Sequence, residues 1–125
     1  MRAAGIPIVT LCFGLTAQSD AVHFNRHIRP ILSDRCFACH GPDAKARKAK
    51  LRLDTFEGAT ADRGGYAALV PGKPRSSRIL QRLRHPSPKK RMPPAKSKLR
   101  VSNAEIALIE QWIAQGGRYT RHWAF

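Results

Sequence analysis

The sequence predicts a small, mostly α-helical domain with short extended segments. Apolar residues recur at helical spacing in three stretches, near residues 24–35, 76–84 and 103–115. Segments rich in proline or glycine separate these stretches. At 125 residues, the chain is expected to form one domain at most.

The first 19 residues have the pattern of a secretory signal peptide. Arg2 gives a short positive start, residues 3–15 carry no charge, and Ala17-Gln18-Ser19 fits a cleavage site. The apolar run is short for a bilayer span, so we expect no stable membrane span after cleavage. The predicted organisation is a signal peptide at 1–19 and one domain at 20–125, in a periplasmic, secreted or cell-surface protein. An uncleaved N-terminal anchor is the alternative.

Residues 24–35 are predicted to form the first helix of the domain. Asn25 is the candidate N-cap. Pro30 is expected either to kink this helix or to begin its regular part. The apolar residues that recur at helical spacing are Phe24, Ile28, Ile31 and Leu32.

A C-x-x-C-H motif, CFACH at residues 36–40, follows this helix directly. It is the signature of covalent haem attachment, because each thiol can join one vinyl group of the porphyrin while the adjacent imidazole binds the iron. A zinc site would need a second ligand pair, and no cysteine follows Cys39. We expect one covalent haem c on Cys36 and Cys39 with His40 as proximal ligand. The Pro42 carbonyl, or one near it, is the candidate acceptor for the His40 ring N–H.

The middle of the chain is predicted to be largely irregular. Residues 51–53 alternate apolar and basic, which indicates a short strand or extended segment. Residues 58–66 are small and glycine-rich and are expected to form a loop. Ser76 or Ser77 is expected to cap a helix that runs to about Arg84. The inner side of that helix is expected to carry Ile79, Leu80 and Leu83.

Met92, in the sequence RMPP, is the candidate second axial ligand of the iron. A thioether is a soft, neutral ligand that raises the reduction potential, and the two prolines would stiffen its loop. Met92 is also the only methionine that remains after removal of the signal peptide. An open distal site is an alternative. The rival ligands are His23, His27, His85 and His122, of which His85 is the strongest because it lies in the same proline-rich stretch.

The last predicted helix begins at a capping box, Ser102-Asn103-Ala104-Glu105. Gly116 or Gly117 is expected to end it. Trp112 is expected to pack against the first helix or the haem. The residues that share its apolar face are Ile106, Ile109, Trp112 and Ile113.

The chain is strongly basic, with 23 Lys and Arg and a net charge of +15. These residues are scattered along the sequence and accompany no recognisable nucleic-acid-binding fold, so we expect no specific nucleic-acid binding. Scattered positive charge keeps a protein soluble and steers it toward acidic partners.

These residues together resemble the planctomycete-type cytochrome c domain, a class I-like c-type cytochrome. The resemblance implies a small cytochrome c-like helical domain around a covalent haem, with His40 and Met92 as axial ligands. Family members usually continue into further domains, so the chain resembles a free-standing module or the N-terminal module of a longer protein. The residues that carry the resemblance are Phe24-Asn25-Arg26, residues 28–32, residues 36–42, Leu51-Arg52-Leu53-Asp54, residues 70–74, Met92-Pro93-Pro94 and His122-Trp123-Ala124-Phe125.

The function expected from these observations is single-electron transfer rather than enzymatic catalysis. The expected partner is a redox protein with an acidic surface or a fused downstream domain. Two alternatives remain. One is a haem enzyme or gas sensor with an open or bis-His distal site, and the other is a module that tethers missing downstream domains.

Overall fold

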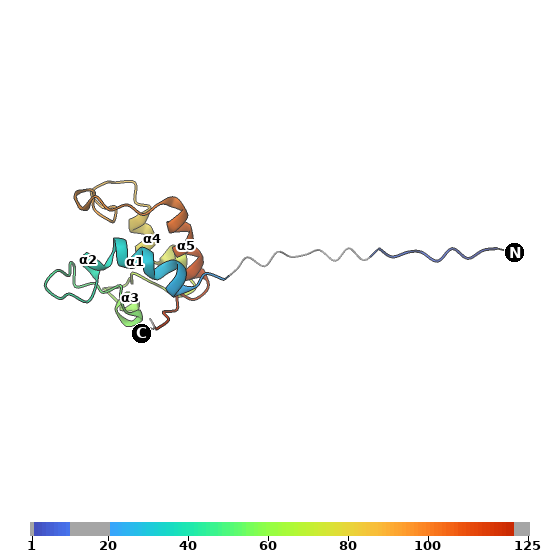
Figure 1. Cartoon of the computed structure of the whole chain (residues 1–125), viewed down its shortest axis with the longest axis horizontal. Coiled ribbons are helices and arrows are strands. Elements are labelled where there is room, and N and C mark those ends of the chain that lie inside the picture. Colours follow the sequence, from blue (N-terminus) through green and yellow to red (C-terminus); the bar gives the residue numbers. More distant parts are fainter. Residues whose placement is uncertain (1, 11–20, 122–125) are drawn as a thin grey trace.

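The computed structural model describes residues 2–10 and 21–121, and within them the chain forms helices and no sheet (Figure 1). The prediction of a mostly α fold is therefore confirmed. The elements are η1 (Phe24–Ile28), α1 (Arg29–Arg35), α2 (Phe37–His40), α3 (Phe56–Thr60), η2 (Pro74–Ser76), α4 (Arg78–Leu83), η3 (Ala95–Ser97) and α5 (Asn103–Ala114).

The N-terminal stretch is described only in part. Residues 2–10 form no helix or strand and their side chains are exposed. The predicted cleavage site at residues 17–19 lies outside the described residues. Among the residues that are described, no helix has both the length and the apolar character needed to cross a bilayer.

The first predicted helix consists of a π-helical turn, η1, followed by the regular helix α1. Pro30 lies in the first turn of α1. The regular part of the helix therefore begins at this proline, which is one of the two effects predicted for it. The prediction that Asn25 caps the helix was wrong, because His23 occupies the N-cap position. The Asn25 side chain instead accepts a bond from Arg29 Nε (3.0 Å) and donates to the Arg121 carbonyl (2.8 Å).

Helix α5 begins and ends as predicted. The Ser102 hydroxyl accepts from the Glu105 N–H (3.1 Å), and the Glu105 carboxylate accepts from the Ser102 N–H (3.0 Å), which completes the capping box. Gly116 and Gly117 both have positive φ, and their N–H groups donate to the carbonyls of the last turn.

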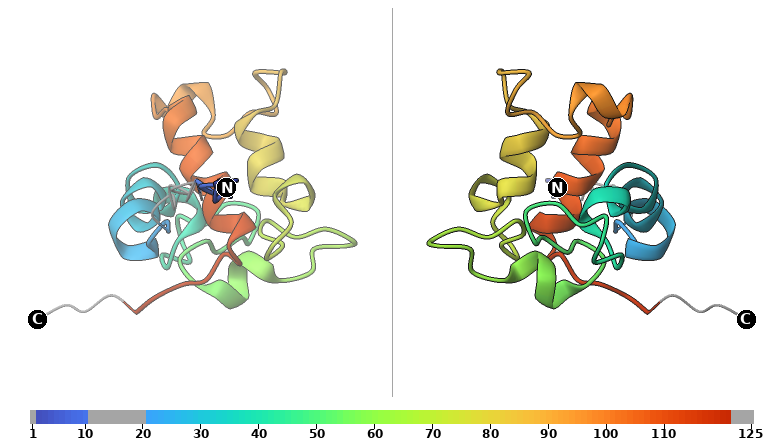
Figure 2. Two further views of the ribbon diagram at one scale, coloured as in Figure 1. Left: turned by 90° about the vertical axis from the view of Figure 1, so that its right-hand side faces the viewer. Right: turned by 90° about the vertical axis from the view of Figure 1, so that its left-hand side faces the viewer.

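The core lies where α5 meets η1 and α4, and α1 adds Ile31 and Leu32 to it. Figure 2 shows α4 and α5 side by side with the loops of residues 85–101 above them. The Phe24 ring lies 5.5 Å from the Trp112 ring and 4.5 Å from the Tyr119 ring, measured between centroids. Trp112 therefore packs against the first helical segment, one of its two predicted positions. Ile28, Ile109 and Ile113 are fully buried in the same cluster.

The middle of the chain contains one short helix that was not predicted. Residues 58–60 were predicted to be loop, but they belong to the short helix α3. The Thr55 hydroxyl accepts from the Gly58 N–H (3.1 Å) and so caps this helix. Residues 51–53 form no strand and run as an irregular segment.

Helix α4 begins at Arg78, directly after Ser77, but the Ser77 side chain does not cap it. The buried Ser77 hydroxyl accepts from the Val70 N–H (2.9 Å) and donates to the Lys73 carbonyl (2.9 Å). Ser77 therefore joins the turn before α4 to the preceding apolar segment. Leu80 and Leu83 face the core, as predicted.

Candidate haem site

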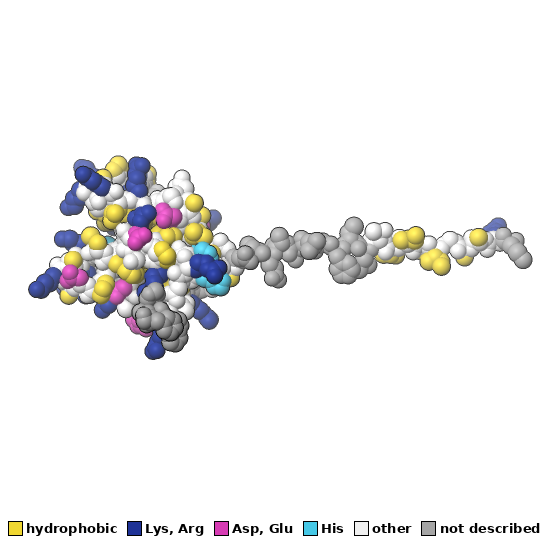
Figure 3. Space-filling model, viewed as in Figure 1, with side chains coloured by type: hydrophobic (Ala, Val, Ile, Leu, Met, Phe, Trp, Pro, Cys, Tyr) yellow, Lys and Arg dark blue, Asp and Glu magenta, His cyan; other side chains and the backbone are white. Residues whose placement is uncertain are grey.

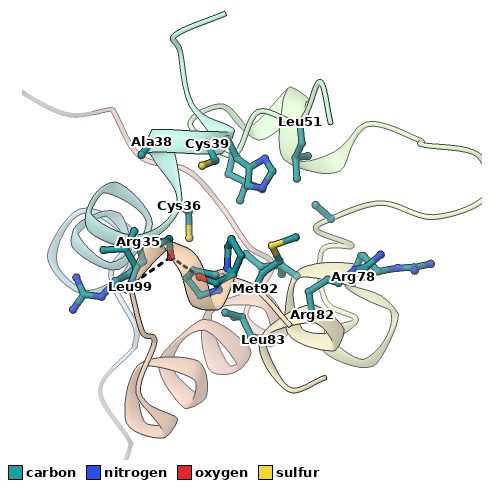
Figure 4. A pocket seen from close by; sticks show the side chains of 17 residues that line it. Arg35, Cys36, Ala38, Cys39, Leu51, Arg78, Arg82, Leu83, Met92 and Leu99 are labelled. Carbon is teal, nitrogen blue, oxygen red and sulfur yellow. Dashed lines mark hydrogen bonds between the residues drawn. The ribbon is translucent and has the colours of Figure 1, made fainter. Parts of the chain in front are cut away.

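A pocket with mainly apolar walls lies between α2, α4 and the loop that carries Met92 (Figure 4). Its empty space, including the part open to solvent, is about 690 Å³. The apolar walls include Leu51, Leu53, Ala68, Ile79, Leu83 and Leu99.

All four residues that the sequence predicted as haem ligands or attachment points line this one pocket: Cys36, Cys39, His40 and Met92. The His40 N–H donates to the Cys36 carbonyl (2.8 Å), which closes one helical turn and places the two thiols about one turn apart. Figure 4 shows the sulfurs of Cys36 and Met92 directed into the space between α2 and the Met92 loop. The fold thus brings Met92 to the C-x-x-C-H motif from a distant part of the chain.

The Cys36 thiol has the properties of a protonated, half-buried group. Burial raises its pKa to about 12, although the positive charge of Arg35 acts in the opposite direction. Redox C-x-x-C motifs, in contrast, hold a cysteine of lowered pKa. Cys36 and Cys39 form no disulfide. The environment of Cys36 therefore does not favour a redox-active C-x-x-C motif.

A hydrogen bond holds the backbone at His40. The His40 carbonyl accepts from the Leu53 N–H (2.7 Å), so the irregular segment at residues 51–53 is joined to the end of α2. Burial lowers the pKa of the imidazole, while the backbone of Lys48 and of Leu51 raises it. The neutral form favoured by burial is the form that binds a metal.

The predicted hydrogen bond from the His40 ring to the Pro42 carbonyl is not formed. Arg47 donates to the carbonyls of Gly41 (3.0 Å) and Pro42 (3.1 Å) instead. The buried Nδ1 atom of His40 has no hydrogen-bond partner in the structure. A buried, unpartnered polar atom is uncommon and often marks a functional position.

The chemistry of the pocket fits a covalently attached haem. Two thiols lie one turn apart and could each join one vinyl group, an imidazole lies beside them, and a thioether approaches from a different segment. The apolar walls suit the macrocycle. Within residues 2–10 and 21–121, no group of three or more His, Cys, Asp and Glu side chains is arranged to hold a single metal ion.

The rival histidines that the structure describes do not line this pocket. His85 Nδ1 accepts from the Ser87 N–H (3.0 Å), and His85 lines a neighbouring groove. His23 and His27 lie at η1, with their rings stacked at 5.9 Å. His122 lies outside the described residues.

Three arginines that were not predicted as site residues also line the pocket: Arg35, Arg78 and Arg82. Arg78 and Arg82 are four residues apart on α4, so they share one face of that helix. This spacing was the available signal, but only the structure shows that the face borders the pocket.

The comparison with protein families agrees with this geometry. A family model described as Planctomycete cytochrome C matches residues 36–96, a segment that begins at Cys36 and includes Met92. The match and the pocket together agree with a haem-binding domain of the c-type cytochrome class. Within these residues the chain is similar to the planctomycete cytochrome c family. No match was found among curated proteins or among solved structures.

Proposed function

We propose that this chain is an exported carrier of single electrons, with one haem c joined to Cys36 and Cys39 and bound through iron to His40 and Met92. The observation that carries the proposal is the convergence of these four side chains on one apolar pocket. When bound, haem supplies an iron that alternates between the ferric and ferrous states.

The side chains of the pocket would set the properties of that iron. His40 offers a neutral imidazole, because burial lowers its pKa. Met92 offers a thioether, which favours the ferrous state and raises the reduction potential. The apolar walls exclude water and lower the local dielectric, which further tunes the potential.

An acidic redox partner, or an acidic fused domain, is the partner that the charge distribution favours. Met92 and Pro93 also line a neighbouring groove. The charged side chains of this groove are Arg35, Arg84, Arg91, Lys98, Arg100 and Glu105. Figure 3 shows many more Lys and Arg side chains than Asp and Glu on the face it presents. Electron transfer to such a partner should slow as salt is added, because salt screens exposed charges.

Export is part of the proposal because c-type haem is attached outside the cytoplasmic membrane. The pattern of residues 1–19 supports this location. We therefore assign the carrier to the periplasm or the cell exterior.

Optical spectra of the matured protein and of Met92→Ala test the ligand set. The wild-type protein should show a charge-transfer band from sulfur to ferric iron, and the variant should lose it. The reduced wild-type protein should resist carbon monoxide, whereas the variant should bind it. His85→Ala is the matched control and should keep the wild-type spectrum. An unchanged Met92→Ala spectrum, or loss of the band in His85→Ala, would contradict Met92 ligation.

A further inference from the structure

The charged side chains of the haem pocket are unevenly paired. Arg35 is close to two carboxylates, those of Asp34 (3.7 Å) and Glu105 (4.0 Å). Arg78 and Arg82 form no ion pair within the part of the chain that the structure describes. Two half-buried guanidinium groups without an anionic partner thus border an otherwise apolar pocket.

The local contacts of these two arginines leave donors free. The Arg78 guanidinium lies 4.1 Å from the centroid of the Tyr66 ring, a stacking contact that does not use its N–H groups. Arg82 donates from Nη1 to the Lys90 carbonyl at 3.3 Å, a long bond that occupies one of its five donors. Both arginines can therefore accept an additional carboxylate as a hydrogen-bond partner.

The position of the arginines relative to the cysteines is the second observation. Figure 4 shows Arg78 and Arg82 at the side of the pocket away from Cys36 and Arg35. A haem carries its two vinyl groups on adjacent pyrroles at one edge and its two propionates at the opposite edge. Attachment of the vinyl edge to Cys36 and Cys39 would therefore direct the propionates away from the cysteines.

We propose that Arg78 and Arg82 bind the two propionates of the haem and so fix the rotation of the macrocycle in its pocket. The proposal rests on the proposed function, since it presupposes attachment at Cys36 and Cys39. Guanidinium groups suit this role because their planar donor sets match carboxylates and stay charged at every physiological pH. Arg35 has carboxylates of its own and lies at the other end, so it does not take part.

The test uses the matured holo-protein with Arg78→Gln, Arg82→Gln and, as matched control, Arg35→Gln. The measured quantity is the propionate bending mode in the resonance Raman spectrum. Arg78→Gln and Arg82→Gln should each shift this mode, because each removes a hydrogen bond to a propionate. Arg35→Gln should leave it unchanged.

The reduction potential gives a second readout. Removal of Arg78 or Arg82 leaves a propionate charge uncompensated, which favours the ferric state and lowers the potential. We expect a several-fold shift of the ferric–ferrous equilibrium, where tenfold corresponds to ~59 mV for one electron. Arg78→Lys and Arg82→Lys should restore most of the potential but not the bending mode, because lysine keeps the charge and loses the planar donor set.

Each result has a defined meaning. A wild-type bending mode in both Gln variants, in protein that still carries covalent haem, would overturn the propionate assignment and leave the proposed function intact. The propionate assignment would also be overturned if Arg35→Gln shifted the bending mode as much as Arg78→Gln and Arg82→Gln do. Wild-type protein without covalent haem would instead overturn the proposed function. If a Gln variant does not acquire haem, the Lys variant at that position replaces it. A wild-type bending mode in the Lys variant would overturn the propionate assignment, and a shifted mode would support it.

Discussion

The Tyr119 hydroxyl connects the C-terminal segment to Leu53, whose backbone is bonded to that of the candidate ligand His40. The Tyr119 hydroxyl donates to the Leu53 carbonyl at 2.6 Å, and the Leu53 N–H donates to the His40 carbonyl at 2.7 Å. Burial is the main cause that raises the pKa of Tyr119, so the hydroxyl keeps its proton at neutral pH. Tyr119→Phe should therefore weaken the packing that positions His40.

The size of the effect follows from the burial of the acceptor. Leu53 is 4% exposed, so its carbonyl would lose a donor that water replaces poorly. Leaving a buried acceptor unsatisfied costs about 1–3 kcal/mol of unfolding free energy. For a domain of about 100 residues, each kcal/mol lowers Tm by about 4–8 °C. Thermal unfolding of the matured protein, followed by circular dichroism, measures this change.

Tyr66→Phe is the matched control. Tyr66 is 39% exposed and its ring packs against the Arg78 guanidinium, a contact that phenylalanine preserves. Its unfolding free energy should change by no more than about 0.5 kcal/mol. If Tyr119→Phe had the same Tm as Tyr66→Phe, the argument from the buried hydrogen bond would be refuted.

Local contacts also determine the response of stability to pH, to loss of a helix cap and to loss of the haem. A hydrogen bond from Arg52 lowers the pKa of the Asp54 carboxyl in the folded protein. The ionised carboxylate therefore stabilises the fold at pH values above 3.8, the ordinary pKa of the group. This stabilisation is lost as the pH falls through the lowered pKa of the folded state. Urea unfolding of Asp54→Asn should therefore show a smaller loss of stability below pH 4 than wild type, and an equal loss would contradict this. Ser102→Ala should lower the free energy of unfolding by about 1 kcal/mol, because it removes the side-chain cap of α5. An unchanged midpoint of urea unfolding would contradict this capping role. The haem-free double variant Cys36→Ala, Cys39→Ala should have a lower Tm than the matured protein, because the apolar walls of the pocket lose the macrocycle as a packing partner. Equal Tm values would contradict a stabilising role of the haem.

The features that the sequence predicted correctly are those specified by neighbouring residues. Helix α5 has its cap, apolar face and terminal glycines within one short stretch, so local chemistry determines its bounds. The C-x-x-C-H motif is likewise local, since its spacing alone sets the two thiols one turn apart. These signals need no information about the rest of the fold.

The predictions that were wrong concern positions where distant residues decide the outcome. Asn25 does not cap its helix because its side chain bonds to Arg29 and to the distant Arg121. Gly58 was assigned to a loop, but a Cβ at that position would approach the Arg52 carbonyl to 2.7 Å. Glycine there thus permits close packing on the segment that carries Arg52.

The functional role of α4 was missed for a related reason. A pair of arginines four residues apart is usually a solvated helix face, and the sequence does not show what the face borders. Only the packing of α4 against α5 and the approach of the Met92 loop place Arg78 and Arg82 at the pocket.

Covalent haem on Cys36 and Cys39 is the property on which the proposed function depends. Denaturing electrophoresis followed by a peroxidase stain for haem tests it directly, with protein from a host that has the c-type maturation machinery. The wild-type chain should retain a stained band after denaturation, and Cys36→Ala, Cys39→Ala should show none. A colourless wild-type band under these conditions would contradict the claim.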